Sequence, residues 1–560
     1  MFPKKELAQL VISVCHQFDV DTVVISPGSR NAPLTVGFTN HPKIKTLSVV
    51  DERCAAFFAL GIAQQTQKPV VITCSSGSAL LNYYPAIAEA YYSQIPLIVI
   101  SADRPKHLID IGDGQTIRQE NVFENHILFS ANLIEEENKL KNNTDLLVEA
   151  FQASIIKKGP VHINVPFDEP LYETVNEEYP VIANKVKQSF DVLNVISSAV
   201  EKSQIDYQKF SSIWNSSIKK MILVGSSFPD SELQKALSLF AENSSVIILT
   251  ETTSNLHHPK FINSIDKVIF PLSVEQFEVF KPEVLVTLGG MVISKKIKQL
   301  LRKSPPKDHW HIDELKAMDT YHCLSEFVQT NPVDFLTNLC EINKDIKSDY
   351  QQIWLEEKTQ REEKHDAYLQ ICEYSDLKVF ESILQKIPND SQLQISNSST
   401  IRYSQLFNVN PTLRVFCNRG ASGIDGSTST AVGAAFAVNK STTFITGDLS
   451  FFYDSNALWN TNTPKNFRII ILNNAGGGIF RFIPGPLTTN AADYFETPHN
   501  LTAEHLAKMY GFDYVSVEDL KELDSSLATF YAESNQPKIM EVFTPKEIND
   551  VVLKNYFKNL

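Results

Sequence analysis

The sequence predicts an α/β protein made of three doubly wound domains, each with a parallel sheet that helices cover on both faces. Short, almost continuously apolar segments alternate with segments of helical period, which is typical of parallel strands that are buried on both faces. The chain also has 560 residues, too many for one hydrophobic core. We expect domains at about residues 1–180, 181–370 and 371–560.

The first domain shows the alternation most clearly. Residues 1–18 place apolar side chains at helical spacing and predict an amphipathic helix rather than a signal peptide. We expect strands within 21–33, 45–50, 69–74, 96–103 and 162–168, with helices between them.

The second and third domains are separated by charged and polar segments. Residues 180–215 predict a linker that becomes helical towards its end, and strands are expected within 219–227, 244–252, 283–290 and 309–314. Residues 345–370 are strongly charged at helical spacing and predict a solvated connecting helix. The third α/β set begins near residue 377.

Composition excludes several classes of function. A net charge of −14 argues against a general nucleic-acid surface, because the chain has no excess of cations. No apolar run is long enough to cross a membrane. The seven cysteines are scattered without CxxC spacing, so we expect reduced core residues in a cytoplasmic protein and no metal site among them.

The stretch 443–480 is the strongest candidate for a functional site. It predicts a strand at 443–446, a Gly-Asp turn, a helix through 456–459 and a second strand at 467–472. The carboxyl ends of parallel strands meet at one edge, so Asp448 and Asn474 are expected to lie together. With a carbonyl from the glycine run 476–478 they form an oxygen set that suits Mg²⁺ and a diphosphate. An ordinary βαβ unit with an Asp-capped helix is the alternative.

Glu52 and a group of cations are further candidates for a functional site. Glu52 lies between an apolar strand and an apolar helix, where a desolvated carboxyl group with a raised pKa is expected. The simpler explanation is helix capping.

Cations follow strand ends or begin helices and predict a ligand with several carboxylates. They are Arg30, Arg104, Arg402, Arg419, Lys295 and Lys296.

These motifs resemble, in order and over the whole chain, the 2-succinyl-5-enolpyruvyl-6-hydroxy-3-cyclohexene-1-carboxylate synthases of menaquinone biosynthesis, a family of thiamine diphosphate enzymes. The matching blocks are SPGSRNAPLT at 26–35, the strand and helix around Glu52, residues 75–105, the Gln115 loop, NRGASGIDG at 418–426, GDLSFFYDSNAL at 447–458 and NNAGGGIF at 473–480. The resemblance implies a transferase that decarboxylates 2-oxoglutarate and adds the succinyl carbanion equivalent to isochorismate.

The resemblance also implies roles for individual residues. Mg²⁺ or Mn²⁺ would be bound by Asp448, Asn474 and Gly476. Thiamine diphosphate would be bound by Glu52, Ser398, Ile424, Gly447, Asp448, Leu449, Ser450, Asn474, Ile479 and Phe480. The two substrates would be bound by Arg30, Arg104, Gln115, Lys295, Ser398, Arg402 and Arg419. The catalytic set would be Glu52, Arg30, Gln115, Arg402 and Arg419.

Two positions depart from the family pattern. Gly114 replaces a common asparagine and Lys296 a common arginine, so a side-chain hydrogen bond and a planar fork are lost there. The resemblance further implies a homodimer or homotetramer with active sites between subunits, so that Glu52 and Asp448 of one site come from different chains. The middle domain shows no GxGxxG and is not expected to bind a cofactor of its own.

Two alternatives remain open at this point. A simple 2-oxoacid decarboxylase or an acetohydroxyacid-synthase-like enzyme would need fewer cations, and some members would need a flavin site. A binding module on the same scaffold would need no catalytic carboxyl group, because fold alone does not determine function.

Overall fold

Three parallel sheets organise the chain. The structure is a computed structural model that describes residues 1–177, 205–482 and 485–560. Each sheet has six strands, which confirms the α/β class. The boundary predicted near residue 180 and most of the predicted linker lie outside the described residues; the helix expected at the end of that linker is α8 (Tyr207–Ser216).

The described chain forms two compact units. Of the described residues, the first contains 1–177, 418–439 and 450–467, and the second contains 205–417, 440–449, 468–482 and 485–560. The two helical segments 418–439 and 450–467 therefore belong with the N-terminal sheet, although the strands around them in sequence belong to the second unit.

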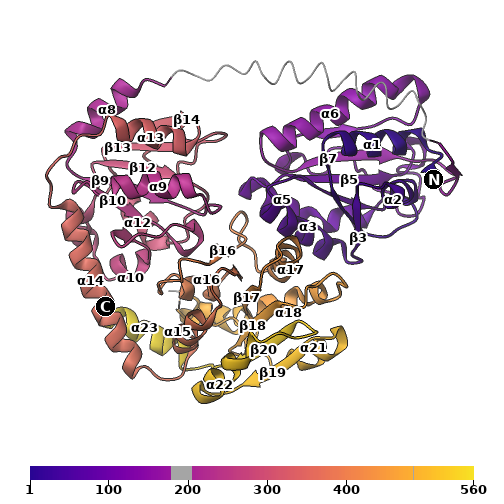
Figure 1. Cartoon of the computed structure of the whole chain (residues 1–560). Helices are drawn as coiled ribbons and strands as arrows, with labels where there is room; N and C mark the ends of the chain where they lie inside the picture. The colour runs from indigo at the N-terminus through magenta and orange to yellow at the C-terminus, as the bar shows by residue number, and fades with distance from the viewer. Residues whose placement is uncertain (178–204, 483–484) are drawn as a thin grey trace. The chain divides into compact units, whose positions relative to one another are not determined.

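In the first unit the strand order is β3-β2-β4-β5-β7-β6. Its strands are β2 (Thr22–Ile25), β3 (Lys45–Ser48), β4 (Val70–Cys74), β5 (Leu97–Asp103), β6 (Ser130–Asn132) and β7 (Val161–Pro166), and a short pair β1 (Phe2–Pro3) and β8 (Thr174–Val175) is antiparallel. Its helices are α1 (Glu6–Gln17), α2 (Ala32–Asn40), α3 (Glu52–Thr66), α4 (Ser78–Asn82), α5 (Tyr84–Ser93), α6 (Leu140–Ile156), α17 (Ser427–Ala437) and the 3₁₀ turn η5 (Ser455–Leu458). Helices α1 and α6 lie on one face of the sheet and α3 and α5 on the other (Figure 1).

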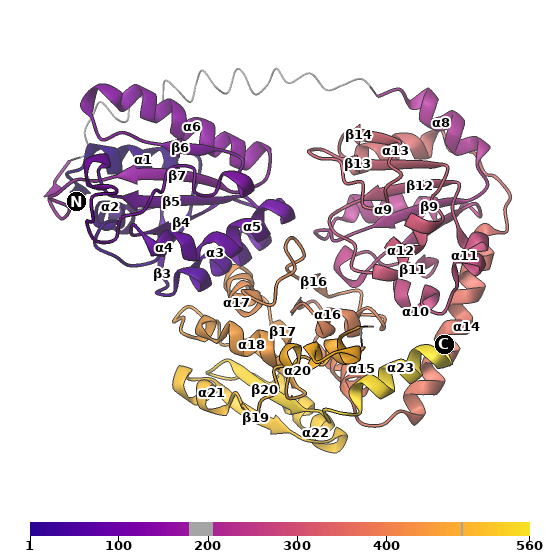
Figure 2. The same cartoon turned by 180° about the vertical axis from the view of Figure 1, so that it is seen from behind.

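The second unit contains two sheets. The order of the first is β11-β10-β9-β12-β13-β14, with β9 (Lys220–Val224), β10 (Val246–Leu249), β11 (Phe261–Ile262), β12 (Val284–Leu288), β13 (Asp308–Asp313) and β14 (Glu326–Gln329). The order of the second is β16-β15-β17-β18-β20-β19, with β15 (Gln392–Ile395), β16 (Arg414–Phe416), β17 (Thr442–Gly447), β18 (Phe467–Asn473), β19 (Asp513–Val517) and β20 (Lys538–Phe543). Figure 2 shows helices α21 and α22 beside strands β19 and β20.

The helices of the second unit complete its layers. They are α8, α9 (Ser231–Phe240), α10 (Ile265–Ile269), α11 (Val274–Phe280), α12 (Lys295–Lys303), α13 (Pro332–Glu341), α14 (Tyr350–Ile371), α15 (Asp376–Lys386), α16 (Ser399–Ser404), α19 (Ile479–Phe482), α20 (Ala491–Phe495), α21 (Glu504–Tyr510), α22 (Leu520–Phe530) and α23 (Asn549–Asn559). Helix α18 (Asp448–Tyr453) begins in the second unit, and its residues from 450 onwards belong to the first. Several begin at side-chain caps, as at Asp230 before α9 and Asn331 before α13.

Two details differ from the sequence prediction. The helix expected through 456–459 begins earlier, at Asp448, and ends in the short turn η5, because the carboxylate of Asp448 bonds the amide of Leu449 at the first turn. Helix α14 is not simply solvated: Tyr350 and Trp354 are fully buried, so one stripe of this charged helix packs on the core.

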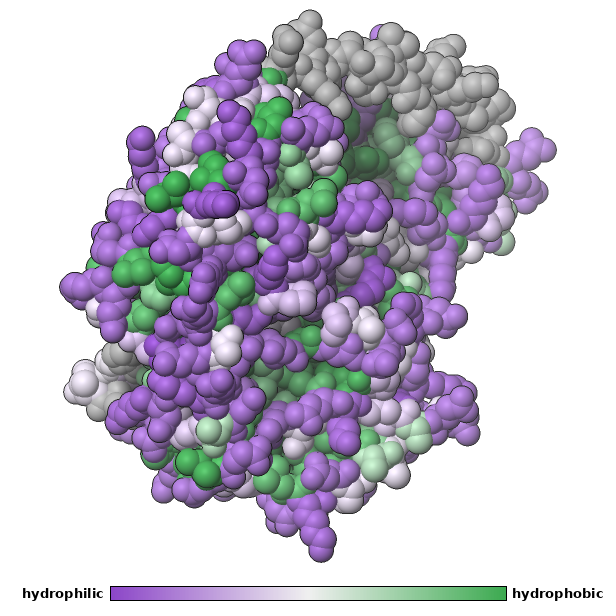
Figure 3. All heavy atoms as spheres, turned by 60° about the vertical axis from the view of Figure 1, so that its left-hand side comes forward, coloured by the Kyte–Doolittle hydropathy of each residue, from purple (hydrophilic) through white to green (hydrophobic). Residues whose placement is uncertain are grey.

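The composition leads to expectations for the surface and for the cysteines, and the structure agrees with part of them. The face drawn in Figure 3 is mostly hydrophilic, with apolar residues in small groups. No helix among the described residues is long and apolar enough to cross a membrane. All seven cysteines are free, but Cys323, Cys340 and Cys372 are only partly buried, so the expectation that all are core residues is wrong for these three.

Candidate active site

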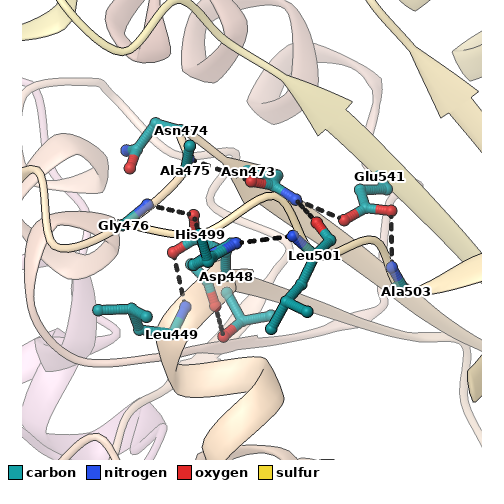
Figure 4. Close-up of polar contacts among 12 residues, drawn as sticks. Asp448, Leu449, Asn473, Asn474, Ala475, Gly476, His499, Leu501, Ala503 and Glu541 are labelled. Carbon is teal, nitrogen blue, oxygen red and sulfur yellow. Dashed lines mark hydrogen bonds and ion pairs between the residues drawn. The ribbon is translucent and has the colours of Figure 1, made fainter. Parts of the chain in front are cut away.

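Asp448 lies at the carboxyl end of β17, where the strand passes directly into α18. Its side chain is 3% exposed. One carboxylate oxygen accepts a hydrogen bond from the Leu449 amide at 2.6 Å and the other accepts one from the Gly476 amide at 3.0 Å. His499 Nε2 is 3.3 Å from the second oxygen. Figure 4 shows Asp448 and His499 together at this edge. The hydrogen bond from Gly476 brings Asp448 to the loop that directly follows Asn474; the shared site of Asp448 and Asn474 stays a prediction.

The two asparagines that end β18 have different surroundings. Asn473 donates to the Leu501 carbonyl at 3.0 Å and to the buried carboxylate of Glu541 at 2.7 Å. Asn474 donates to Asp376 Oδ2 at 3.0 Å, but its oxygen Oδ1 is buried and has no hydrogen-bond partner among the described residues. A buried oxygen without a donor is costly unless a ligand completes it.

Glycines give the loop after Asn474 its shape. Gly476 has φ 141°, and a Cβ atom there would lie 2.4 Å from the Glu496 carbonyl oxygen. At Gly478 a Cβ atom would lie 3.3 Å from the nitrogen of the Asn474 amide. Gly476 therefore needs to be glycine, whereas a side chain at Gly478 would crowd the Asn474 amide.

These groups fit a hard divalent cation. The carboxylate of Asp448, the unpartnered amide oxygen of Asn474 and the carbonyl of Gly476 are the kinds of oxygen that Mg²⁺ takes from proteins when phosphate oxygens complete its coordination. The fit rests chiefly on the buried Oδ1 of Asn474.

A cavity of about 610 Å³ adjoins this edge within the second unit. Asp376, Asn474 and Ile479 line one part of it, and Phe270, Phe482, Leu553 and Phe557 give it an apolar wall. The volume lies in the range of small-molecule pockets.

The cavity carries a group of cations at one side. Lys295, Lys296 and Arg402 all line it. Lys295 and Lys296 occupy the first turn of α12, where a positive charge opposes the helix dipole. Burial lowers the pKa of Lys296. Because the placement does not stabilise the helix, it is best explained by an anion that the cavity binds.

The buried carboxyl group of Glu251 and the half-buried one of Asp266 hold the start of α12. Glu251 accepts the amides of Ile293 at 2.6 Å and Ser294 at 2.7 Å, and burial raises the pKa of Glu251 to about 7. The hydroxyl of Ser294 donates to Asp266, and burial also raises the pKa of Asp266, which Arg402 lowers in turn. Glu251 and Asp266 therefore support the start of α12, which carries Lys295 and Lys296, and Asp266 also interacts with Arg402.

In the first unit, Arg30 and Arg104 follow strands β2 and β5 at the same edge of the sheet. Arg30 is 3% exposed; it donates to the Phe167 carbonyl at 2.8 Å and lies 3.2 Å from Glu169. Burial lowers the pKa of Arg30, and the nearby Arg104 lowers it further. Two guanidinium groups in proximity are unfavourable alone and suit an anionic ligand between them.

The loop that contains Gln115 lies next to these arginines. Arg104 donates to the Gly114 carbonyl at 3.1 Å, so Gly114 contributes a backbone group although it lacks a side chain. Gln115 is exposed with φ 56°. The buried Gln119 accepts from the Gly77 amide at 2.8 Å and donates to Asn164 at 2.9 Å, which ties the loop to the sheet.

Glu52 begins α3, as the sequence predicts, but it is only half-buried. The expectation of a desolvated carboxyl group is therefore not met within the described chain. The capping function belongs to its neighbour Asp51, which accepts the Cys54 amide at 3.1 Å. Glu52 is thus not needed as the cap, and the capping explanation applies to Asp51 instead.

The segment around Arg419 is held by a carboxylate that the sequence does not single out. Glu89, 2% exposed, accepts the amides of Gly420 and Ala421, both at 2.7 Å. In the same segment Ile424 is 37% exposed, and its carbonyl accepts from Ser450 at 2.7 Å.

Three other predicted residues lie at the ends of strands or the beginnings of helices. Ser398 caps α16 with φ 70°, an unfavourable conformation for serine that is common at functional sites. Phe480 in α19 contacts Phe495, with ring centroids 5.2 Å apart. Gly447, the last residue of β17, lies next to Thr400, whose hydroxyl would be 3.7 Å from an added Cβ atom.

Three residues of these sites were not predicted: Asp376, Glu89 and His499. Asp376 and Glu89 are buried acids on helices, a pattern that by itself indicates only a helix. His499 follows a proline in a segment without regular structure, so no periodicity marks it.

Comparison with known families covers most of the chain. Residues 5–128 match the model "Thiamine pyrophosphate enzyme, N-terminal TPP binding domain", residues 196–395 match "Middle domain of thiamine pyrophosphate", and residues 397–542 match "Thiamine pyrophosphate enzyme, C-terminal TPP binding domain".

Whole-chain relatives narrow the family. Proteins named 2-succinyl-5-enolpyruvyl-6-hydroxy-3-cyclohexene-1-carboxylate synthase from Flavobacterium johnsoniae and Flavobacterium psychrophilum are 54% and 53% identical, with 100% of each chain covered. One of the same name from Christiangramia forsetii is 50% identical, with 99% of each chain covered. The chain belongs to the thiamine pyrophosphate enzymes and, within them, to the family of 2-succinyl-5-enolpyruvyl-6-hydroxy-3-cyclohexene-1-carboxylate synthases.

Proposed function

We propose that the chain is a thiamine diphosphate-dependent transferase that decarboxylates 2-oxoglutarate and adds the succinyl unit to isochorismate. The products are 2-succinyl-5-enolpyruvyl-6-hydroxy-3-cyclohexene-1-carboxylate and CO₂, a step of menaquinone biosynthesis. The observation that carries the proposal is the end-to-end match to relatives named for this product at 50–54% identity.

The cofactor and its metal ion have fitting residues. Thiamine diphosphate, when bound, supplies the carbanion chemistry that releases CO₂ from a 2-oxoacid and joins the remaining acyl unit to an acceptor. Asp448, Asn474 and the Gly476 carbonyl would hold Mg²⁺ or Mn²⁺ together with the diphosphate. The Glu52 carboxyl group would bind the pyrimidine ring of the cofactor, and the exposed side chain of Ile424 would support the cofactor.

The cations bind the substrates. Both acids are dianions at neutral pH, whereas the chain as a whole carries a charge of −14, so local clusters must attract them. Lys295 and Arg402 supply one cluster at the cavity of the second unit. Arg30, Arg104 and the Gln115 loop supply another in the first unit.

An omission assay tests this function. Purified protein is mixed with thiamine diphosphate, Mg²⁺, 2-oxoglutarate and isochorismate, each omitted in turn, while isochorismate absorbance and CO₂ are followed. We expect isochorismate loss only in the complete mixture, with equal CO₂. CO₂ without isochorismate loss would identify a simple decarboxylase, and cofactor binding without any turnover would identify a binding module.

We also propose a cytoplasmic homodimer or homotetramer with active sites between subunits, as the resemblance of the sequence motifs implies. Co-expression of Glu52→Gln and Asp448→Asn variants tests this. If each site takes these residues from two chains, random pairing restores about a quarter of the sites. If both residues of a site come from one chain, no activity returns.

A further inference from the structure

The adjacent residues Asn473 and Asn474 provide an internal comparison. Each amide nitrogen donates to a buried carboxylate: Asn473 to Glu541 at 2.7 Å and Asn474 to Asp376 at 3.0 Å. The oxygen of Asn473 accepts from the Ala475 amide at 3.1 Å, so this side chain is fully satisfied. The oxygen of Asn474 is buried and has no partner among the described residues.

The carboxylate of Asp376 determines which end of the Asn474 amide faces the loop. A carboxylate can only accept hydrogen bonds, so it selects the NH₂ group and turns the oxygen the other way. A flipped amide would aim two N–H donors at the place where the cation is expected, which would repel it.

Asp376 is itself held firmly. It is 3% exposed. Its other oxygen accepts from the Thr544 hydroxyl at 2.6 Å, and its backbone amide donates to Asn549 at 2.8 Å. Gly478 leaves just enough room beside the Asn474 amide, since a Cβ atom there would lie 3.3 Å from the nitrogen. Asp376 therefore selects the orientation of the Asn474 amide, and Gly478 leaves room for it.

We propose that Asp376 is a positioning residue for the metal site: by binding the nitrogen of Asn474, it presents the amide oxygen to the divalent cation that stabilises the bound diphosphate. The inference rests on the proposed function, because it requires Asn474 to be a metal ligand. Partners that orient a metal ligand typically contribute 10–100-fold to metal affinity.

The test measures Mn²⁺ affinity directly. Mn²⁺ is titrated into protein with saturating thiamine diphosphate, and free Mn²⁺ is followed by electron paramagnetic resonance, with Tm recorded for each variant. We expect Asp376→Asn to weaken Mn²⁺ binding by about 10–100-fold. The matched control Asp550→Asn lines the same cavity but bonds Lys554, and we expect its Mn²⁺ affinity to stay at the wild-type value.

A reciprocal variant keeps the test decisive if Asp376→Asn folds poorly. In Asn474→Asp two carboxylates face one another, and Mn²⁺ binding should fall. In the double variant Asp376→Asn/Asn474→Asp the new amide donates to the new carboxylate, so affinity should recover at least in part. A double variant that binds no better than Asn474→Asp would overturn the inference.

The outcomes separate this inference from the proposed function. If wild type binds Mn²⁺, Asp448→Asn does not, and Asp376→Asn binds as wild type does, the metal site stands and the positioning role is wrong. If wild type with thiamine diphosphate binds no Mn²⁺, the proposed metal site fails and the positioning role fails with it.

Discussion

Replacing Arg402 by alanine tests the assignment of the cavity in the second unit as a substrate site. Arg402 lines this cavity with Lys295 and Lys296 and interacts with the half-buried Asp266. Without its guanidinium group a substrate carboxylate would lose a charged hydrogen-bond partner, which costs about 2–4 kcal/mol in kcat/KM. At about 1.4 kcal/mol per decade, kcat/KM should fall roughly 30- to 1,000-fold.

The assay is steady-state kinetics with each substrate varied, together with Tm. Arg402→Lys keeps the charge but loses the planar fork, so we expect an intermediate loss of kcat/KM. Arg302→Ala serves as the control, because this exposed arginine of α12 bonds only the Thr320 carbonyl in the described chain. If Arg402→Ala lowers Tm but leaves kcat/KM unchanged, Arg402 merely stabilises Asp266 and the reasoning is refuted.

Three further outcomes are expected. Glu52→Gln should leave thiamine diphosphate affinity within a few-fold but lower kcat by about two orders of magnitude or more. Calorimetry measures the affinity and single-turnover rates measure the catalytic step. Unchanged turnover would contradict the catalytic role of Glu52. Gly61→Ala places a Cβ atom 2.1 Å from the Thr430 carbonyl oxygen, so it should destabilise the first unit by about 1–3 kcal/mol, seen as a lower Tm. Burial raises the pKa of Glu251 from 4.5 to about 7, so its stabilising contribution is present at low pH and is lost as pH rises from about 4.5 to 7. The Tm difference between wild type and Glu251→Gln should therefore shrink over that range. A Tm difference that stays constant with pH would argue against the raised pKa.

The arrangement of the residues proposed for the metal site could be predicted because it follows from sheet geometry. Asp448 and Asn474 each end an apolar strand, and parallel strands place their carboxyl ends at one edge. The same rule placed Arg30 and Arg104 together at the edge of the first sheet. Long apolar strands were equally easy to locate, whereas β6 and β11 have three and two residues and too little pattern to be found.

The supporting residues could not be predicted. Asp376 is 98 positions from Asn474, and Glu89 is 331 positions from Gly420, and neither separation leaves a local signal. Glu52 was expected to be desolvated because its neighbours are apolar, but burial depends on what covers the helix start. In α14 the many charges obscured a buried stripe that includes Tyr350 and Trp354.

The close contact of α3 with α17 constrains how the protein can be divided. Gly61 of α3 faces the Thr430 carbonyl, and Gly433 of α17 faces the Phe58 carbonyl, where added Cβ atoms would lie 2.1 and 2.0 Å away. A fragment that ends before residue 178 would keep its own sheet but lack α17, leaving an apolar helix face with nothing over it. Such a fragment should aggregate alone, so a cut at the boundary of the first sequence domain would separate α3 from the helix that covers it.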